Sequence, residues 1–247
     1  MAEIFADLLT EDGSIVIELR NAWEPERPVQ SLLHLESLLG FVQNPDAELR
    51  LCQQFICYNP SRLPSPAQWV TVERIRVKDA FTRVWWLSPV ERPKANNLNI
   101  LTEYSKSMQA LLERGTYNSG PRPSEHHIGK KSFLSNNGGA IPPNVVVPGF
   151  DDIAIGLFEV LPISNTRAND PYQIYCRRNG ITPHPARMQA ELASFFIKFL
   201  SDKRELVLDP FAGSNTTGAV SQQLGRRWLS IELNPDYITS SRSRVGL

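Results

Sequence analysis

The sequence predicts an α/β fold, and its C-terminal part carries the clearest evidence. Residues 205–208 form a short apolar run typical of a buried parallel strand. A helical segment through Leu224 follows and ends at Gly225, and a second strand spans 227–232. One carboxylate stands at the end of each strand, Asp209 and Glu232. An α/β fold holds a nucleoside in this way, with the acidic group accepting hydrogen bonds from the ribose.

The turn between the first strand and the helix narrows the choice of ligand. Gly213 allows a tight turn and a close approach of the backbone to a ligand, and Ser-Asn-Thr-Thr at 214–217 supplies cap and first-turn hydroxyls. The turn has no G-x-G-x-x-G, and Asp209 stands where a pyrophosphate would need N–H groups without negative charge. A nicotinamide-dependent oxidoreductase is therefore disfavoured. A nucleoside that carries positive charge, such as S-adenosylmethionine, is favoured.

The run Asp-Pro-Phe-Ala-Gly-Ser-Asn-Thr-Thr-Gly at 209–218, with Trp-Leu-Ser-Ile-Glu at 228–232 and Tyr237, resembles the cofactor segment of site-specific DNA amino-methyltransferases. These are the cytosine-N4 and adenine-N6 enzymes of restriction–modification systems, in the permuted class with this motif C-terminal. The resemblance implies a Rossmann-like methyltransferase sheet with S-adenosylmethionine as cofactor. The form Ser-Asn-Thr-Thr-Gly at 214–218 favours a cytosine-N4 enzyme, and an adenine-N6 enzyme is the alternative. The implied contacts are Asp209, Phe211, Gly213, Ser214 and Thr216 for the turn, and Glu232 for the ribose.

A second match precedes the long helix expected over 191–200. His-Pro-Ala-Arg at 184–187 resembles the family's entry to this helix, which lies over the cofactor, so His184 and Pro185 are implied contacts. The family's Phe-Pro after this motif is Met188-Gln189 here, and an ordinary helix-entry hydrogen bond is the alternative role for His184. We expect the helix to pack beside the Asp209 strand through Leu192, Phe195, Phe196, Phe199 and Leu200.

The N-terminal part alternates short helices and strands. A short amphipathic helix near residues 4–9 precedes a buried strand at 14–19, and a helix is expected over 29–39. Strands at 49–58 and 83–87 are expected to pair antiparallel at a sheet edge. Between them, residues 69–79 suggest another strand in which three alternating basic side chains share one face. These side chains are Arg74, Arg76 and Lys78, and both a phosphate contact and a solvated face fit them.

Residues 96 to about 163 change in character and are rich in loop residues. Between Tyr104 and Ala140 five basic residues stand against two acidic ones, a local net charge of +3, whereas the whole chain balances 26 basic against 26 acidic residues. Such a locally basic insertion suits contacts with phosphates and base edges. The family places target recognition here, which implies double-stranded DNA as partner. The candidate contacts are Arg122, Ser124, His126, Lys130 and Lys131.

We therefore expect three regions in the chain. Residues 1–95 would form the N-terminal part of the catalytic domain, 96–175 a target-recognition insertion, and 176–247 the cofactor-binding part.

The family's catalytic turn is absent from the sequence. In relatives a (Ser/Asp/Asn)-Pro-Pro-(Tyr/Phe) turn accepts the amino hydrogens and stacks on the flipped base. Ile-Pro-Pro-Asn at 141–144 lacks both the acceptor and the aromatic residue, and Asp170-Pro171-Tyr172 lacks the second proline and is expected in a loop. Neither is given a catalytic role.

In the permuted order the catalytic turn would lie upstream of Met1, with its strand between the 14–19 and 205–208 strands. Its loss leaves an incomplete sheet with two unpaired edges. We expect a split or truncated enzyme, possible partners being DNA and a complementary N-terminal chain. A catalytically silent DNA- or cofactor-binding remnant is the alternative, and the isolated chain is expected to transfer no methyl group.

Composition excludes some other classes. Three cysteines show no Cys-x-x-Cys spacing, so neither zinc nor a disulfide framework is expected. No signal peptide precedes the first helix and no apolar run approaches 18 residues, which predicts a cytoplasmic protein.

Overall fold

The computed structural model describes residues 1–59, 62–121, 127–129, 133–146 and 170–246. Its largest sheet has the strand order β1-β3-β2-β6. The bounds are β1 Ile15–Leu19, β2 Arg50–Tyr58, β3 Phe81–Ser88 and β6 Val145–Val146. β3 is antiparallel to both β1 and β2, as expected for the 49–58 and 83–87 strands. The expectation that both lie at an edge was wrong, because β3 lies between β1 and β2, and β2 pairs with the short β6 on its other side. The β3 side chains Val84 to Ser88 are buried.

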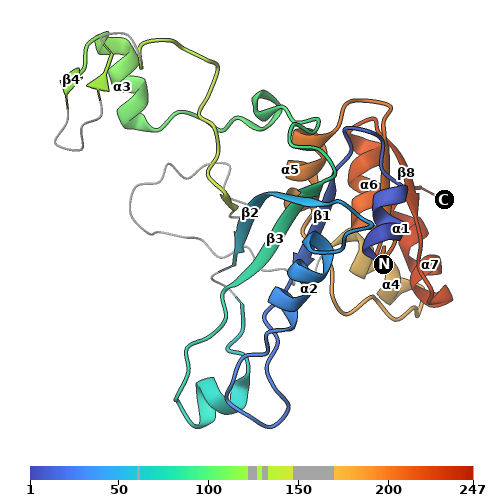
Figure 1. Ribbon diagram of the computed structural model, residues 1–247. Helices are drawn as coiled ribbons and strands as arrows, with labels where there is room; N and C mark the ends of the chain where they lie inside the picture. Colours follow the sequence, from blue (N-terminus) through green and yellow to red (C-terminus); the bar gives the residue numbers. More distant parts are fainter. Residues whose placement is uncertain (60–61, 122–126, 130–132, 147–169, 247) are drawn as a thin grey trace.

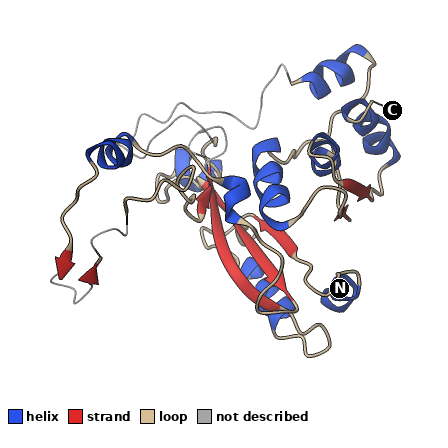
Figure 2. Ribbon diagram, turned by 90° about the horizontal axis from the view of Figure 1, so that it is seen from above, coloured by secondary structure: helices blue, strands red, loops and turns tan. Residues whose placement is uncertain are grey.

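A second, two-stranded sheet carries the C-terminal motif. β7 (Leu206–Asp209) and β8 (Arg227–Ser230) are parallel, with Asp209 opposite Ser230, and α6 (Thr216–Gln223) connects them. Gly225 has φ +73 and follows α6, as the sequence predicts. This strand–helix–strand unit stands apart from the larger sheet (Figures 1 and 2).

Helix α5 (Ala190–Leu200) packs between the two sheets with two different faces. Leu192 and Phe196 form one core cluster with Phe55 and Trp86 of β2 and β3, and Phe195, Phe199 and Leu200 pack against it. Ala193 and Ile197 form another cluster with Val220 of α6, against which Val207 of β7 packs. The aromatic face thus meets the large sheet and not the Asp209 strand, which corrects the expected packing. Ala193 and Ile197, on the other face of α5, pack towards α6 and β7 instead.

The amino ends of β1 and β7 lie together. The Lys94 ammonium pairs with the Glu205 carboxylate just before β7, and the Lys94 backbone N–H donates to Asp12 O at 3.0 Å just before β1. Helix α1 (Ala2–Asp7) places the Phe5 ring against that of Phe211, with 6.3 Å between ring centroids. Within the described residues β1 pairs only with β3 and β7 only with β8. Each therefore has one edge without a partner strand among the described residues.

Two loops leave the carboxyl ends of β1 and β2. Residues 22–31 fold back, with Trp23 and Gln30 bridged and Ser31 N–H donating to Ala22 O at 2.9 Å. This pairing removes residues 29–31 from the helix expected at 29–39, so α2 spans Leu33–Val42.

The expected strand at 69–79 was also wrong. A π-helical turn, Gln68–Val72, is followed by irregular backbone, and Arg74 has φ +59. Alternation alone could not show this, because a strand also needs a neighbour, and none of the described strands pairs with this segment.

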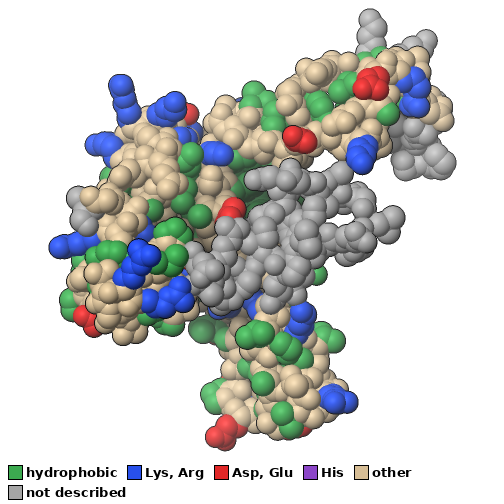
Figure 3. All heavy atoms as spheres, turned by 180° about the vertical axis from the view of Figure 1, so that it is seen from behind, with side chains coloured by type: hydrophobic (Ala, Val, Ile, Leu, Met, Phe, Trp, Pro, Cys, Tyr) green, Lys and Arg blue, Asp and Glu red, His purple; other side chains and the backbone are tan. Residues whose placement is uncertain are grey.

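A separate arm leaves the body between Thr102 and Ala140. These two residues exchange backbone hydrogen bonds of 2.9 Å in each direction. The arm holds α3 (Lys106–Arg114) and the short pair β4 (Gly120–Pro121) and β5 (His127–Ile128), and it projects from the body (Figures 1 and 3). Before it, η2 (Asn97–Ile100) packs on α5, and Asn96 N–H donates to Phe199 O at 2.8 Å.

The remaining helices surround the C-terminal motif. α4 (Pro171–Arg178) packs against α7 (Pro235–Ser241) and the short η3 (Arg242–Arg244). No helix in the described ranges is long and apolar enough to cross a membrane.

Candidate cofactor site

The turn after β7 is shaped by one glycine. Gly213 has φ +51, in the left-handed region that L side chains rarely adopt. A Cβ on this residue would lie 3.1 Å from the His184 ring. Glycine thus suits both the backbone conformation and the close approach of the imidazole.

Two carboxylates frame this turn at the carboxyl ends of β7 and β8. Asp209 Oδ1 accepts the Phe211 N–H at 3.0 Å. Glu232 accepts the Asn234 N–H on Oε1 and the Gly213 N–H on Oε2, both at 2.8 Å. The backbone donors at Asn234, Gly213 and Leu233 lower the pKa of Glu232, against the effect of its desolvation, so it is ionised at neutral pH. Each oxygen keeps a second lone pair for a ligand hydroxyl.

Helix α6 begins at the turn. Asn215 is its N-cap, with φ +55, and its Oδ1 accepts both the Gly218 N–H at 3.2 Å and the Ser230 hydroxyl at 2.7 Å. The predicted contacts Ser214 and Thr216 are buried and lie 3.3 Å apart between their hydroxyl oxygens. Phe211, by contrast, is 70% exposed. The turn therefore presents an aromatic ring and backbone, with the hydroxyls beneath.

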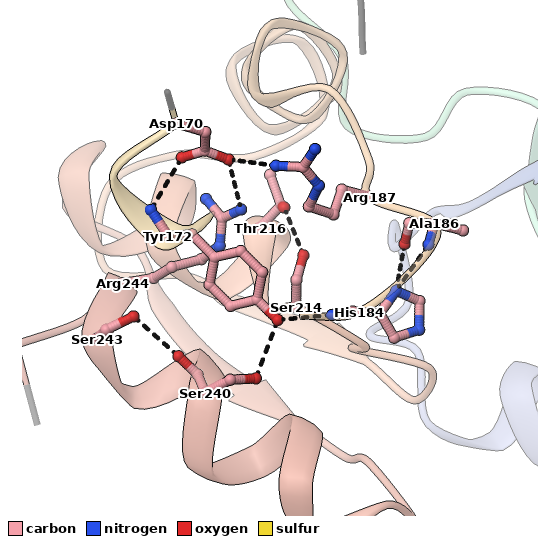
Figure 4. Close-up of polar contacts among 10 residues, drawn as sticks. All are labelled: Asp170, Tyr172, His184, Ala186, Arg187, Ser214, Thr216, Ser240, Ser243 and Arg244. Carbon is pink, nitrogen blue, oxygen red and sulfur yellow. Dashed lines mark hydrogen bonds and ion pairs between the residues drawn. The ribbon is translucent and has the colours of Figure 1, made fainter. Parts of the chain in front are cut away.

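His184 covers the turn from another segment of the chain. Its ring lies against Gly213 and in edge contact with the Tyr237 ring, with 4.5 Å between centroids. Its backbone N–H donates to the buried Tyr172 hydroxyl at 3.0 Å (Figure 4). Pro185 follows and is exposed. The structure thus brings together the predicted residues Asp209, Phe211, Gly213, Glu232 and His184.

An ion-paired group beside this site was missed by sequence reasoning. Asp170 Oδ2 pairs with Arg187 at 2.7 Å and with Arg244 at 3.3 Å, and Asp170 Oδ1 caps α4 by accepting the Tyr172 N–H (Figure 4). The expected loop at Asp170-Pro171-Tyr172 was therefore wrong. Asp before Pro is a common start of a helix, and this signal was available in the sequence.

The predicted DNA contacts are only partly within the described residues. Arg74, Arg76 and Lys78 are exposed, but Arg76 donates to Pro28 O at 2.7 Å and so links the two loops. Arg122, Ser124, His126, Lys130 and Lys131 lie outside the described residues.

The residues fit a nucleoside ligand with a cationic end. Glu232 offers an ionised acceptor for hydroxyls, Asp209 adds a second carboxylate at the same edge, and the glycine turn allows close approach between them. A group of three or more acidic, His or Cys side chains that could hold a metal is not found in the part of the chain that the structure describes.

A protein-family model matches almost the whole chain. The model of the family N6_N4_Mtase, described as DNA methylase, matches residues 1–243. The type II methyltransferase M.PvuII of Proteus hauseri is 39% identical over 245 residues, which is 98% of this chain and 68% of that protein. The DNA adenine methyltransferase YhdJ of Escherichia coli K12 is 42% identical over 64 residues, 26% of this chain and 22% of that protein.

Solved structures agree in fold. The PvuII DNA methyltransferase, named as cytosine-N4-specific, matches with a TM-score of 0.73 and 32% identity over 98% of this chain and 67% of that one. The M1.HpyAVI complex with SAM matches with a TM-score of 0.54 at 15% identity, over 100% of this chain and 80% of that one, and shows likeness of fold alone. The expected α/β methyltransferase sheet is confirmed.

Proposed function

Because the chain belongs to the N6_N4 DNA methylase family, we propose that it serves S-adenosylmethionine-dependent methylation of DNA at the exocyclic N4 of cytosine. The cytosine assignment is supported by the similarity to M.PvuII and the PvuII methyltransferase over nearly the whole chain. Adenine-N6 is the second candidate, supported by the shorter match to YhdJ.

The cofactor assignment rests on one observation, the convergence of Glu232, Gly213 and His184 at the ends of β7 and β8. Glu232 would accept the ribose hydroxyls, while Asp209, Phe211 and the Gly213 turn would hold the methionine end, with Ser214 and Thr216 beneath and Pro185 at the rim. When bound, the cofactor supplies an electrophilic methyl on a sulfonium. The two carboxylates suit its positive charge.

DNA binding is proposed for the arm and for the loops at the carboxyl ends of β1 and β2. We propose that residues 1–95 form the N-terminal part of the catalytic domain, 96–175 the target-recognition insertion and 176–247 the cofactor-binding part. Within them, residues 96–100 pack on the body and the arm starts at Thr102. The proposed phosphate contacts include Arg74 and Lys78, which are exposed. We place this activity in the cytoplasm.

The acceptor turn that would polarise the cytosine amino group is not among residues 1–247. We propose that methyl transfer requires a further strand between β1 and β7, and that this strand carries the turn, either in a complementary chain or in a longer form of the protein. The support is the free edge of each strand, together with the Lys94 contacts that hold their amino ends together.

The test separates binding from transfer. S-adenosylmethionine affinity is measured by calorimetry for the chain, for Glu232→Gln and for the control Glu205→Gln, whose carboxylate lies at the opposite end of β7. We expect Glu232→Gln to bind about ten-fold or more weakly, since charge-assisted hydrogen bonds contribute about 1.5–3 kcal/mol. The control should bind as the unaltered chain does.

Transfer is then assayed with methyl-labelled cofactor and DNA, and the modified nucleoside is identified by mass spectrometry. We expect binding without transfer by the chain alone. N6-methyladenine in place of N4-methylcytosine, from a completed enzyme, would overturn the cytosine assignment. Turnover by the chain alone would overturn the need for an added strand.

A further inference from the structure

We propose that Tyr172 is a positioning residue of the cofactor site, which acts by holding His184 against the Gly213 turn. This inference rests on the proposed function of that turn. Tyr172 lies on α4, 41 positions before Gly213 in the sequence, and neither its type nor its neighbours in the sequence suggest such a role. The contacts that connect it to the site are drawn in Figure 4.

A directed chain of hydrogen bonds starts at His184. Its backbone N–H donates to the Tyr172 hydroxyl oxygen at 3.0 Å, and that hydroxyl lies 2.9 Å from the Ser240 hydroxyl. Ser240 donates its own proton to Tyr237 O at 3.0 Å. The Tyr172 proton must then go to Ser240, which leaves a Tyr172 lone pair to accept from His184. Every group in the chain is satisfied only in this arrangement.

Tyr172 is itself held firmly. Its side chain is fully buried, with 2% of the residue exposed, and the Arg244 guanidinium lies 4.5 Å from its ring centroid. Asp170 caps the same helix and pairs with both Arg244 and Arg187. Arg187 closes the His-Pro-Ala-Arg segment, so α4 fixes both ends of it. A hydroxyl on so rigid a support can set the position of a backbone N–H closely.

The position of His184 is passed on to the turn. The imidazole lies against Gly213, the Gly213 N–H donates to Glu232, and Glu232 is the proposed ribose acceptor. A displacement of the His184 backbone therefore reaches two of the groups that would contact the cofactor. Loss of the Tyr172 hydroxyl should weaken cofactor binding although Tyr172 itself is buried beneath the site.

Tyr172→Phe tests this, because it removes the hydroxyl and keeps the ring beneath Arg244. Tyr175→Phe on the same helix is the matched control, since no hydrogen bond from its side chain to residues 184–187 is found in the described part of the chain. We expect S-adenosylmethionine to bind about ten-fold more weakly to Tyr172→Phe and unchanged to Tyr175→Phe, measured by calorimetry well below the melting temperature. Hydrogen exchange at the His184 amide should accelerate at least ten-fold in Tyr172→Phe only.

Ser240→Ala is a second variant, used in case Tyr172→Phe does not fold. It leaves Tyr172 unchanged and removes the hydroxyl that accepts the Tyr172 proton. We expect it to bind S-adenosylmethionine about three-fold more weakly. Unchanged affinity in a folded Tyr172→Phe or Ser240→Ala variant, with His184 exchange as in the unaltered chain, would overturn the positioning role and leave the proposed function standing. Failure of the unaltered chain to bind the cofactor would overturn both, so the two failures are distinct.

Discussion

Two separate features favour glycine at position 213, its backbone conformation and its contact with His184. Its φ of +51 lies in a region that L side chains rarely adopt, and a Cβ here would lie 3.1 Å from the His184 ring, which would then have to shift. Gly225, in the same strand–helix–strand unit, has φ +73, but a Cβ there would meet only Lys203 Cγ at 4.0 Å. The pair therefore separates the cost of the backbone conformation from the effect of the His184 contact.

We expect Gly213→Ala and Gly225→Ala to lower the free energy of unfolding by similar amounts, about 1–2 kcal/mol each, because both force alanine into the left-handed region. Only Gly213→Ala should also raise the dissociation constant for S-adenosylmethionine, by ten-fold or more, because it displaces His184. Denaturant unfolding and calorimetry measure the two effects. Equal cofactor affinity in the two variants would refute the role of the glycine turn.

At the residue scale the sequence predicted what a contiguous motif can encode. Asp209, Gly213 and Glu232 were found because they lie in one strand–helix–strand unit whose geometry is local. Tyr172 and Arg244 were not found, since their roles depend on contacts between different segments of the chain. Tyr172 accepts a hydrogen bond from His184, 12 residues away, and Arg244 pairs with Asp170, 74 residues away. A buried tyrosine looks like any core aromatic residue until its hydroxyl partner is known.

Among the elements, α5 joins the two sheets and depends on its aromatic face. Phe196 is 6% exposed, and its ring stands at an edge-on angle to Phe55 of β2, with 5.1 Å between centroids. We expect Phe196→Ala to lower the free energy of unfolding by about 3–5 kcal/mol, since it opens a cavity in this core. Lys198→Ala, on the exposed side of the same helix, is the control and should change it by less than about 0.5 kcal/mol. Thermal and denaturant unfolding measure both, and a loss under 1 kcal/mol for Phe196→Ala would contradict this packing.

The existence of most elements could be predicted from the sequence, whereas their neighbours could not. The strands at 14–19, 49–58 and 205–208 were expected close to where β1, β2 and β7 lie. The strand expected at 69–79 is not formed, because alternating basic residues also occur in loops. Here Arg76 lies in a loop and donates a hydrogen bond to Pro28 O of another loop. The face of α5 that meets β7 was misassigned because both of its faces are apolar.

In the described part of the chain a body and an arm can be distinguished, and a backbone bridge closes the base of the arm. Thr102 and Ala140 exchange two backbone hydrogen bonds, and a Cβ on Gly139 would lie 2.6 Å from Thr102 O. The two segments of the chain therefore approach each other closely at the base of the arm. Because the ends meet there, residues 104–138 can be replaced by a short Gly-Ser turn without separating Thr102 from Ala140.

We expect this deletion to leave S-adenosylmethionine affinity within about two-fold and to weaken strongly the salt-dependent binding of double-stranded DNA, because it removes the locally basic region and leaves only the loops that carry Arg74 and Lys78. Calorimetry and fluorescence anisotropy at two salt concentrations measure the two properties. DNA binding that survives the deletion at full strength would place the main contacts on the loops that carry Arg74 and Lys78.

The contact between Asp170 and Arg244 bears on how the protein matures during synthesis. Arg244 leaves the ribosome after every other residue of the group around Tyr172, including Ser240 and the Gly213 turn itself. Domains fold as units while the chain is still being made, beginning with the N-terminal elements. The large sheet can thus form early, whereas the cofactor turn acquires this support only after Arg244 has been made. A nascent chain that stops short of Arg244 would in this way lack the complete set of contacts that holds the turn for the methyl donor.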